Sequence, residues 1–399
     1  MSKKYLSRLA GASMVAVAAL TFAACSDVVK YDEDYVDIFA ADGPPQIQAV
    51  YDVEDDQSVT PLDGGTLNQM IRIHGKNLSH VKEITFNGLP VDVKEVYATS
   101  TDSYLKIPRK LPEDITNKLV YTTELGTTSL DFQVSIPSMR LEGLFNEFAT
   151  AGESVQVNGE FFDLFGFGDA ESDAQVSLGG VKLEVDSLTE NYMSILIPEG
   201  TPDNSVITFE WTEPGPRRCV KNVPFRYKKY ILLPDLATIG WWDSATLNYV
   251  TDGTHDGDPV STLSKFFRFK GHFDQWSWNS FGGGSNWPDI DCRGKESDYV
   301  LKFEVCSASS YPFYDSEGFG YMFSINDSGN YVWNPSAGAS FNTYGRWQTV
   351  SIPLDRIAVN GTVEPGTWSN FCMIMQPNTD GGWNIDHSFA NFRIEPANF

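Results

Sequence analysis

The sequence repeats one pattern of short alternating strands, and this repeat is what most limits the fold. In each copy an alternating apolar segment ends in a glycine turn, a hairpin signature follows, and a strand ends in Ile-Pro. Their offsets of 84, 92 and 88 residues are about the length of one small β-sandwich. Because no long segment keeps a helical period, the repeat predicts two successive all-β domains. The matched segments are 71–78 with 155–162, 84–93 with 176–185, and 101–108 with 189–198.

A third region after residue 229 carries further strand-like segments separated by turn residues. Six strands of this kind, after a start near Ile231, suit a jelly-roll sandwich. We therefore predict an all-β protein with sandwiches at 43–137, 138–229 and 230–399. The six segments are 265–271, 298–305, 320–326, 347–354, 371–376 and 389–394.

Charge narrows the range of partners. The chain has 399 residues and a formal net charge of −24 at pH 7. We expect no nucleic-acid partner, because Lys and Arg supply most of the affinity for a phosphate backbone. The same charge argues against direct binding to anionic lipid, and it is compatible with a neutral partner rich in hydroxyl groups.

The N-terminus has the features of a bacterial export signal. A basic start is followed by an apolar run over 9–24, which is too short to span a membrane and ends in Phe-Ala-Ala before Cys25. This resembles a lipobox, which implies a signal peptide at 1–24 and a lipid on Cys25. An acidic tether follows at 25–42, so we expect a surface-exposed outer-membrane lipoprotein that touches the membrane through its lipid alone. The alternative is an ordinary cleaved signal peptide in which Cys25 has no role.

The other cysteines and the acidic loops show no metal-ligand spacing. Four cysteines lack any CxxC pair, which leaves buried thiols or a disulfide as alternatives. Asp252, Asp256 and Asp258 could hold a structural calcium, but the spacing is not that of an EF-hand, so a polar turn is the other interpretation. We expect neither a metal nor a cofactor. The four cysteines are Cys219, Cys292, Cys306 and Cys372.

Tryptophan is concentrated in the third region, where nine of the ten residues follow Lys229. A tryptophan beside glycine and short polar residues offers a flat apolar face, which suits the pyranose rings of a polysaccharide. Trp347 and Trp368 adjoin strands and are expected in the core, and neither earlier domain shows an aromatic cluster beside polar turns. The candidate binding residues are Trp242, Trp276, Trp278, Trp287, Trp333 and Trp383, with Gln275 and Asn279 as hydrogen-bonding partners.

Two family resemblances add to this interpretation. The repeated pattern I.I.G.NL, I.FNG and.IP resembles the IPT/TIG immunoglobulin-like domain, present at 43–137 and 138–229. The order WWDSATLNYV, FFRFKG, WSWN, GRWQTVSIPL and GGWNIDHSFANFRI resembles the xyloglucan-binding-type domain of surface glycan-binding protein B. The resemblance implies tandem Ig-like sandwiches followed by a carbohydrate-binding jelly-roll sandwich. It also implies capture of xyloglucan or a related β-glucan beside a TonB-dependent outer-membrane transporter.

Two other functions stay open. One is an adhesin that binds a protein partner through the Ig-like pair. The other is a glycoside hydrolase or lyase, which needs two carboxylates across a cleft. No ExDxxE, HExxH or Gly-x-Ser-x-Gly motif is present, so we expect a protein that is not an enzyme. The glutamates of the third region are Glu296, Glu304, Glu317, Glu364 and Glu395.

Overall fold

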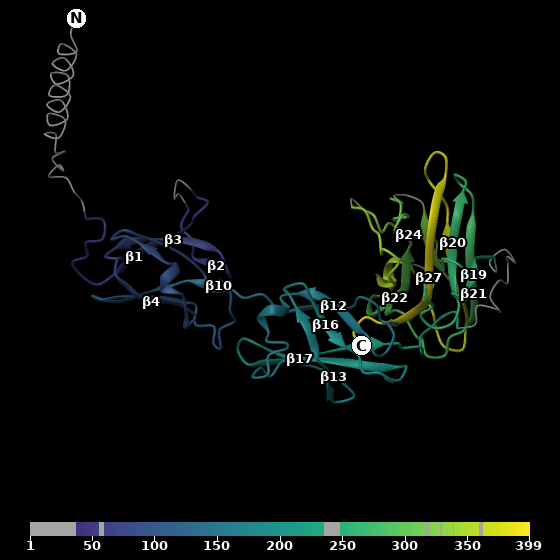
Figure 1. Ribbon diagram of the computed structural model, residues 1–399, viewed down its shortest axis with the longest axis horizontal. Helices are drawn as coiled ribbons and strands as arrows, with labels where there is room; N and C mark the ends of the chain where they lie inside the picture. The colour runs from purple at the N-terminus through teal and green to yellow at the C-terminus, as the bar shows by residue number, and fades with distance from the viewer. Residues whose placement is uncertain are drawn as a thin grey trace, which may run out of the picture. The chain divides into compact units, whose positions relative to one another are not determined.

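The computed structural model describes residues 37–55, 60–234, 248–315, 320–327, 329–337, 339–358 and 362–399 (Figure 1). The chain divides into two compact units. The first comprises residues 1–109 and 116–135, and the second comprises residues 110–115 and 136–399. Strands form nearly all the regular structure of both units, as predicted. Among the residues described, no helix has the length and apolar character needed to cross a membrane.

The first unit is a β-sandwich of two four-stranded sheets with one additional strand pair. Ile71 and Ile73 of one sheet and Ile84 and Phe86 of the other are buried at its centre. One sheet has the order β1 (Gln46–Asp52), β3 (Met70–Lys76), β7 (Asp102–Lys106), β6 (Tyr97–Ala98). The other has the order β5 (Leu89–Pro90), β4 (Val81–Phe86), β8 (Lys118–Thr123), β9 (Gly126–Asp131). The additional pair is β10 (Gln133–Ser135) with β2 (Gly64–Thr66).

The first part of the second unit repeats this arrangement strand for strand. One sheet has the order β11 (Arg140–Leu144), β12 (Ser154–Glu160), β16 (Tyr192–Leu196), β15 (Val185–Leu188). The other has the order β14 (Val181–Lys182), β13 (Gln175–Leu178), β17 (Ser205–Glu213), β18 (Arg217–Phe225).

The hairpin turns of the two copies also agree. Asn87 and Gly88 in the first copy, and Gly179 and Gly180 in the second, all have positive φ, as a two-residue hairpin turn requires. The predicted internal repeat is therefore confirmed.

The C-terminal part of the second unit, here called the C-terminal sandwich, consists of a five-stranded and a four-stranded sheet. The predicted strands are all present, and β27 runs the length of the sandwich (Figure 1). The five-stranded sheet has the order β19 (Val250–Thr251), β20 (Phe266–Phe273), β27 (Trp383–Pro396), β22 (Tyr299–Ser307), β25 (Gln348–Pro353). The four-stranded sheet has the order β21 (Asn279–Asn286), β26 (Trp368–Met375), β23 (Tyr321–Ile325), β24 (Tyr331–Trp333).

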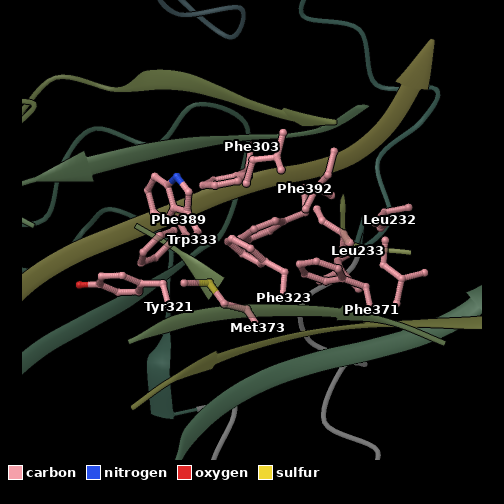
Figure 2. Close-up of a cluster of buried hydrophobic side chains, with 14 of the residues drawn as sticks. Leu232, Leu233, Phe303, Tyr321, Phe323, Trp333, Phe371, Met373, Phe389 and Phe392 are labelled. Atoms are coloured by element: carbon pink, nitrogen blue, oxygen red, sulfur yellow. The ribbon is translucent and has the colours of Figure 1, made fainter. Parts of the chain in front are cut away.

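Aromatic side chains fill the space between these two sheets. Phe303 and Phe392 from the five-stranded sheet stack with ring centroids 5.1 Å apart, and Phe371 of the four-stranded sheet lies 4.9 Å from Phe392 (Figure 2). Cys292, Cys306 and Cys372 are buried, and all four described cysteines are free thiols, which supports the thiol alternative over a disulfide.

A buried ion cluster joins the second Ig-like domain to the outer face of the five-stranded sheet. Glu147, in the loop after β11, accepts from Lys302 Nζ at 2.6 Å and from Arg393 Nη2 at 2.6 Å. Arg393 also donates to Glu304 Oε2 at 3.0 Å, and Lys302 lies 2.6 Å from Glu395. Buried charges are tolerated only when they are paired in this way.

Burial and pairing act in opposite directions on the three carboxyl groups of the cluster. Burial opposes ionisation of Glu147, but Lys302 and Arg393 outweigh it and hold the pKa of Glu147 below its usual value. Burial dominates at the other two groups and raises the pKa of Glu304 and Glu395. The two cations therefore favour ionisation of Glu147 more strongly than that of Glu304 or Glu395.

We expect Glu147→Ala to destabilise the second unit by about 3–5 kcal/mol, because Lys302 and Arg393 would lose their shared partner while staying buried. Urea unfolding followed by tryptophan fluorescence measures this, since nine of the ten tryptophans lie after Lys229. The control is Glu142→Ala, which removes an exposed carboxylate paired with Arg140 and should cost less than about 1 kcal/mol. Equal midpoints for the two variants would contradict a stabilising role for the cluster.

Candidate functional site

The loop between β20 and β21 holds two of the exposed tryptophans. Trp276 has a left-handed φ of 61°; its N–H donates to the Pro377 carbonyl at 2.9 Å, and its carbonyl accepts from Gln376 Nε2 at 3.1 Å. The backbone of Trp276 is therefore fixed by the neighbouring loop, while its side chain is 50% exposed. Trp278, which directly precedes Asn279 of β21, is 59% exposed.

Three consecutive glycines, Gly282 to Gly284, lie in strand β21. β21 pairs with β26 from Asn279 opposite Met375 to Asn286 opposite Trp368. Phe281 points into the core, so Gly282 and Gly284 lie on the outer face of the sheet. At these two positions the outer face of β21 carries no side chain.

Trp368 occupies the space above these glycines. A Cβ atom added at Gly284 would lie 2.4 Å from Trp368 Cζ2 and 2.6 Å from the Ser369 carbonyl oxygen, so only glycine fits beneath the indole. Trp368 is nevertheless 54% exposed. The expectation that Trp368 belongs to the core is therefore wrong. Trp276 and Trp278 precede the first residue of β21, and Trp368 pairs opposite its last residue, Asn286. We call these three exposed indoles, which lie toward the two ends of β21, the tryptophan surface.

Three of the predicted binding tryptophans are buried, so these predictions are wrong. Trp287 donates from Nε1 to the Leu232 carbonyl at 3.0 Å, and Trp333 packs edge-on against Phe303 in the core (Figure 2). Trp383 begins β27 and stacks on Tyr314 with ring centroids 4.9 Å apart. Because each indole is enclosed by its neighbours, none of them can present a face to a ligand. The remaining tryptophan candidate, Trp242, lies outside the described residues.

The two predicted hydrogen-bonding residues differ in their surroundings. Gln275 lies in the exposed β20–β21 loop and donates to Asp380 at 3.1 Å, beside Trp276. Asn279 donates to the Met375 carbonyl at 3.3 Å and accepts from the Tyr249 hydroxyl at 3.0 Å. The Asn279 side chain is therefore engaged in holding the start of β21, and Gln275 is the better placed of the two to meet a ligand.

The joint with the second Ig-like domain leaves the four-stranded sheet uncovered by that domain. Leu301 and Phe303 of β22 face the core, so Lys302 and Glu304, which carry the ion cluster, lie on the outer face of the five-stranded sheet. The tryptophan surface belongs to the other sheet of the sandwich. The ion cluster and Trp368 therefore lie on opposite faces of the C-terminal sandwich.

The acidic loop before β20 is held to the sandwich by an arginine. Asp258 accepts from Thr251 Oγ1 at 2.6 Å and pairs with Arg268, which also contacts Asp386 at 2.7 Å. Burial raises the pKa of Asp258, but hydrogen bonds from Thr251, the His255 backbone and Arg268 outweigh it and leave the pKa lowered. In the part of the chain described here, no three His, Cys, Asp or Glu residues form a metal-binding group.

His387 is a buried histidine of β27 between the two sheets. Its ring stacks on Phe313 at 4.1 Å between centroids, hydrogen bonds to the Tyr321 hydroxyl, and contacts the Tyr311 carbonyl at 2.9 Å through Nε2. Burial lowers the pKa of His387 to about 4, so the imidazole is neutral at physiological pH. His272 is by contrast exposed on β20 and lies 3.2 Å from Asn384.

Comparison with known proteins identifies the C-terminal sandwich. Residues 225–396 match the family described as the surface glycan-binding protein B xyloglucan-binding domain. No curated protein sequence matches the chain significantly.

Two solved structures are similar to this chain. The surface glycan-binding protein B of Prevotella bryantii is 17% identical, with a TM-score of 0.53 over 90% of this chain and 100% of the other. A surface glycan-binding protein B from a complex xyloglucan utilization locus in Bacteroides uniformis is 19% identical, with a TM-score of 0.43 over 88% and 99% of the two chains. The first of these likenesses shows that the two proteins have the same overall fold.

His387→Gln should remove the contribution that His387 makes to the pH dependence of the unfolding free energy. The folded-state pKa of His387, about 4, lies below the ordinary value of 6.5, so the unfolded chain binds more protons between these values. The unfolding free energy of the natural protein should therefore fall by about 3 kcal/mol relative to the variant as pH drops from 6.5 to 4. Urea titrations of both proteins at pH 7 and pH 4.5 test this, and parallel losses would contradict it.

Gly284→Ala should displace the Trp368 indole, because the new methyl group and the ring cannot share the space. We expect the variant to show a shifted tryptophan emission and a stability loss of roughly 1–3 kcal/mol from overpacking. Gly294→Ala is not a suitable control, because Gly294 has a positive φ of 66°. The control is the same substitution in a Trp368→Ala background, where the close approach to the Ser369 carbonyl oxygen remains and the indole is gone. A smaller stability loss from Gly284→Ala in that background than in the natural protein marks the indole as a cause, and equal losses would contradict it.

Proposed function

We propose that this chain, whose residues 225–396 match the surface glycan-binding protein B xyloglucan-binding domain, captures polysaccharide at the cell surface without cleaving it. The ligand we propose is a β-glucan of the xyloglucan type or a related glucan. The observation that carries the proposal is the tryptophan surface, three half-exposed indoles on one sandwich of the matching domain.

The chemistry of this surface suits pyranose rings. The axial C–H groups of a β-linked sugar present an apolar face that an indole can cover, and each such contact contributes about 1 kcal/mol beyond burial. Hydroxyl groups exchange water for hydrogen bonds at a small net gain of about 0.5–1.5 kcal/mol each. A few contacts of both kinds give micromolar to sub-millimolar affinity, and repeated sites on a polymer add avidity.

The state of the carboxyl groups supports binding rather than hydrolysis. Glu304 and Glu395 are buried in the ion cluster, and Glu364 pairs with Arg293 at 2.6 Å. A glycosidase needs two carboxyl groups facing each other across an open cleft. Glu317 lies outside the described residues. The Cys372 thiol is not an alternative nucleophile, because burial raises its pKa to about 12.

Placement at the cell surface belongs to the same proposal. Cys25 would carry the lipid, the acidic segment 25–42 would act as a tether, and both Ig-like domains would act as spacers. By family resemblance the partner would be a TonB-dependent outer-membrane transporter complex. Cys25 lies outside the described residues. Labelling of cells with a radioactive fatty acid, with Cys25→Ser as the comparison, tests the anchor.

We expect Trp276→Ala/Trp278→Ala to weaken xyloglucan binding about 10- to 100-fold, because two stacking faces are lost. Both side chains are at least half exposed, so the thermal midpoint should stay nearly unchanged. Affinity electrophoresis through gels containing xyloglucan, mixed-linkage glucan, β-1,3-glucan or galactomannan measures binding. Thin-layer analysis of the same polymers after incubation measures cleavage.

The matched control is Tyr192→Ala, which removes an exposed aromatic from the second Ig-like domain. Retardation that is lost only in the tryptophan variant supports the proposal. Released oligosaccharides would instead establish an enzyme. Absence of retardation in every gel would favour a protein partner.

A further inference from the structure

A row of aromatic side chains crosses the open face of one sheet in the first unit. The register places Tyr51 opposite Arg72, Arg72 opposite Tyr104, and Tyr104 opposite Tyr97 on four adjacent strands. Ile71 and Ile73 of β3 are buried on the inner face, so Arg72 and the residues paired with it lie on the outer face. Three strand spacings give the row a width of about 14 Å. We call it the tyrosine row.

Contacts between neighbours hold the row together. The Arg72 guanidinium lies 5.8 Å from the Tyr51 ring centroid, and the Tyr97 and Tyr104 rings are 6.2 Å apart at an interplanar angle of 42°. Asp102, on the same face, accepts from Arg72 at 2.8 Å and contacts His74 Nδ1 at 2.9 Å. Tyr97 is 57% exposed. Aromatic faces and hydrogen-bonding groups therefore lie side by side on a surface open to solvent.

The second Ig-like domain shows that the fold does not require these aromatics. There the same row reads Phe145, Gln156, Ser194 and Ser187, with Gln156 opposite Ser194 and Ser194 opposite Ser187. Phe145 packs against the C-terminal sandwich: the Arg346 guanidinium lies 4.7 Å from the centroid of the Phe145 ring, and the Thr349 N–H donates to the Phe145 carbonyl at 2.8 Å. Three of the four equivalent positions thus carry Gln or Ser, and the fourth, Phe145, packs against the neighbouring sandwich.

We propose that the tyrosine row is a second binding site for pyranose rings, and that it takes the same class of β-glucan as the tryptophan surface. Tyrosine rings stack on sugar faces as tryptophan does, and the Asp102–His74 pair beside them can exchange hydrogen bonds with ring hydroxyls. The proposal rests on the proposed function, since it supposes that the chain binds glucan.

A sugar chain fits this surface better than a protein does. The row is one residue wide, with Met70 and Lys106 opposite each other along one side and His74 and Asp102 along the other. A stable protein contact needs about 800 Å² on each partner around an apolar centre. A narrow line of rings, bordered by Lys106, His74 and Asp102 with Met70 as the one apolar neighbour, suits a linear polymer. Binding one polymer at two sites would raise its retention by avidity.

The test compares four full-length chains by affinity electrophoresis through xyloglucan. They are the natural protein, Tyr97→Ala/Tyr104→Ala, Trp276→Ala/Trp278→Ala, and the combination of all four substitutions. We expect the tryptophan variant to keep weak retardation, and the added tyrosine substitutions to weaken it about tenfold further. Tyr97→Phe/Tyr104→Phe keeps both rings and should retain most of the binding, which separates stacking from a folding defect.

The possible outcomes distinguish the second site from the proposed function. Retardation by the tyrosine variant equal to that of its parent, in both backgrounds, overturns the second site while the proposed function stands. Absence of retardation in the natural protein overturns both. Tyr192→Ala, which lies outside the row on the second Ig-like domain, should change nothing, and an equal loss in this control would assign the effect to general loss of aromatic surface.

Discussion

The arrangement of the second unit depends on five ionisable side chains that are buried between its two sandwiches. Burying these groups is costly, and the cost is met only because Glu147 reaches from one domain into a cage of Lys302, Arg393, Glu304 and Glu395 on the other. The pairing fixes which face of the C-terminal sandwich is covered. The exposed tryptophans lie on or beside the other, four-stranded sheet, whose outward-facing Met322, Cys372 and Ile374 form a small buried cluster of their own.

Strand positions could be predicted from the sequence because alternating apolar residues report directly on which side of a strand is buried. Strand β21 is absent from the strands predicted by sequence for a related reason. Glycine has no side chain to alternate and favours turns, so nothing local to residues 282–284 indicates a strand. The strand exists because β26 pairs with it along its whole length and because Trp368 needs the empty space above Gly284.

Burial of individual tryptophans could not be predicted, since it depends on neighbours that are distant in sequence. Trp287 is covered through Leu232, and Trp383 through Tyr314. Trp276 and Trp278 were identified because they lie in a loop whose ends are close in the chain. The tyrosine row was missed because residues 51, 72, 97 and 104 form a pattern only across strands, and its members are separated by whole hairpins.

The ion cluster also has a mechanical consequence. A polymer held at the tryptophan surface transmits any pull on its free ends to the C-terminal sandwich as a torque. The Thr349 N–H donates to the Phe145 carbonyl, and the Thr349 hydroxyl accepts from the Glu147 N–H and donates to Glu304, so these hydrogen bonds and the ion pairs hold the joint together. The second Ig-like domain and the C-terminal sandwich should therefore move together when the polymer is pulled. The force then passes to the segment before residue 136 without bending this joint.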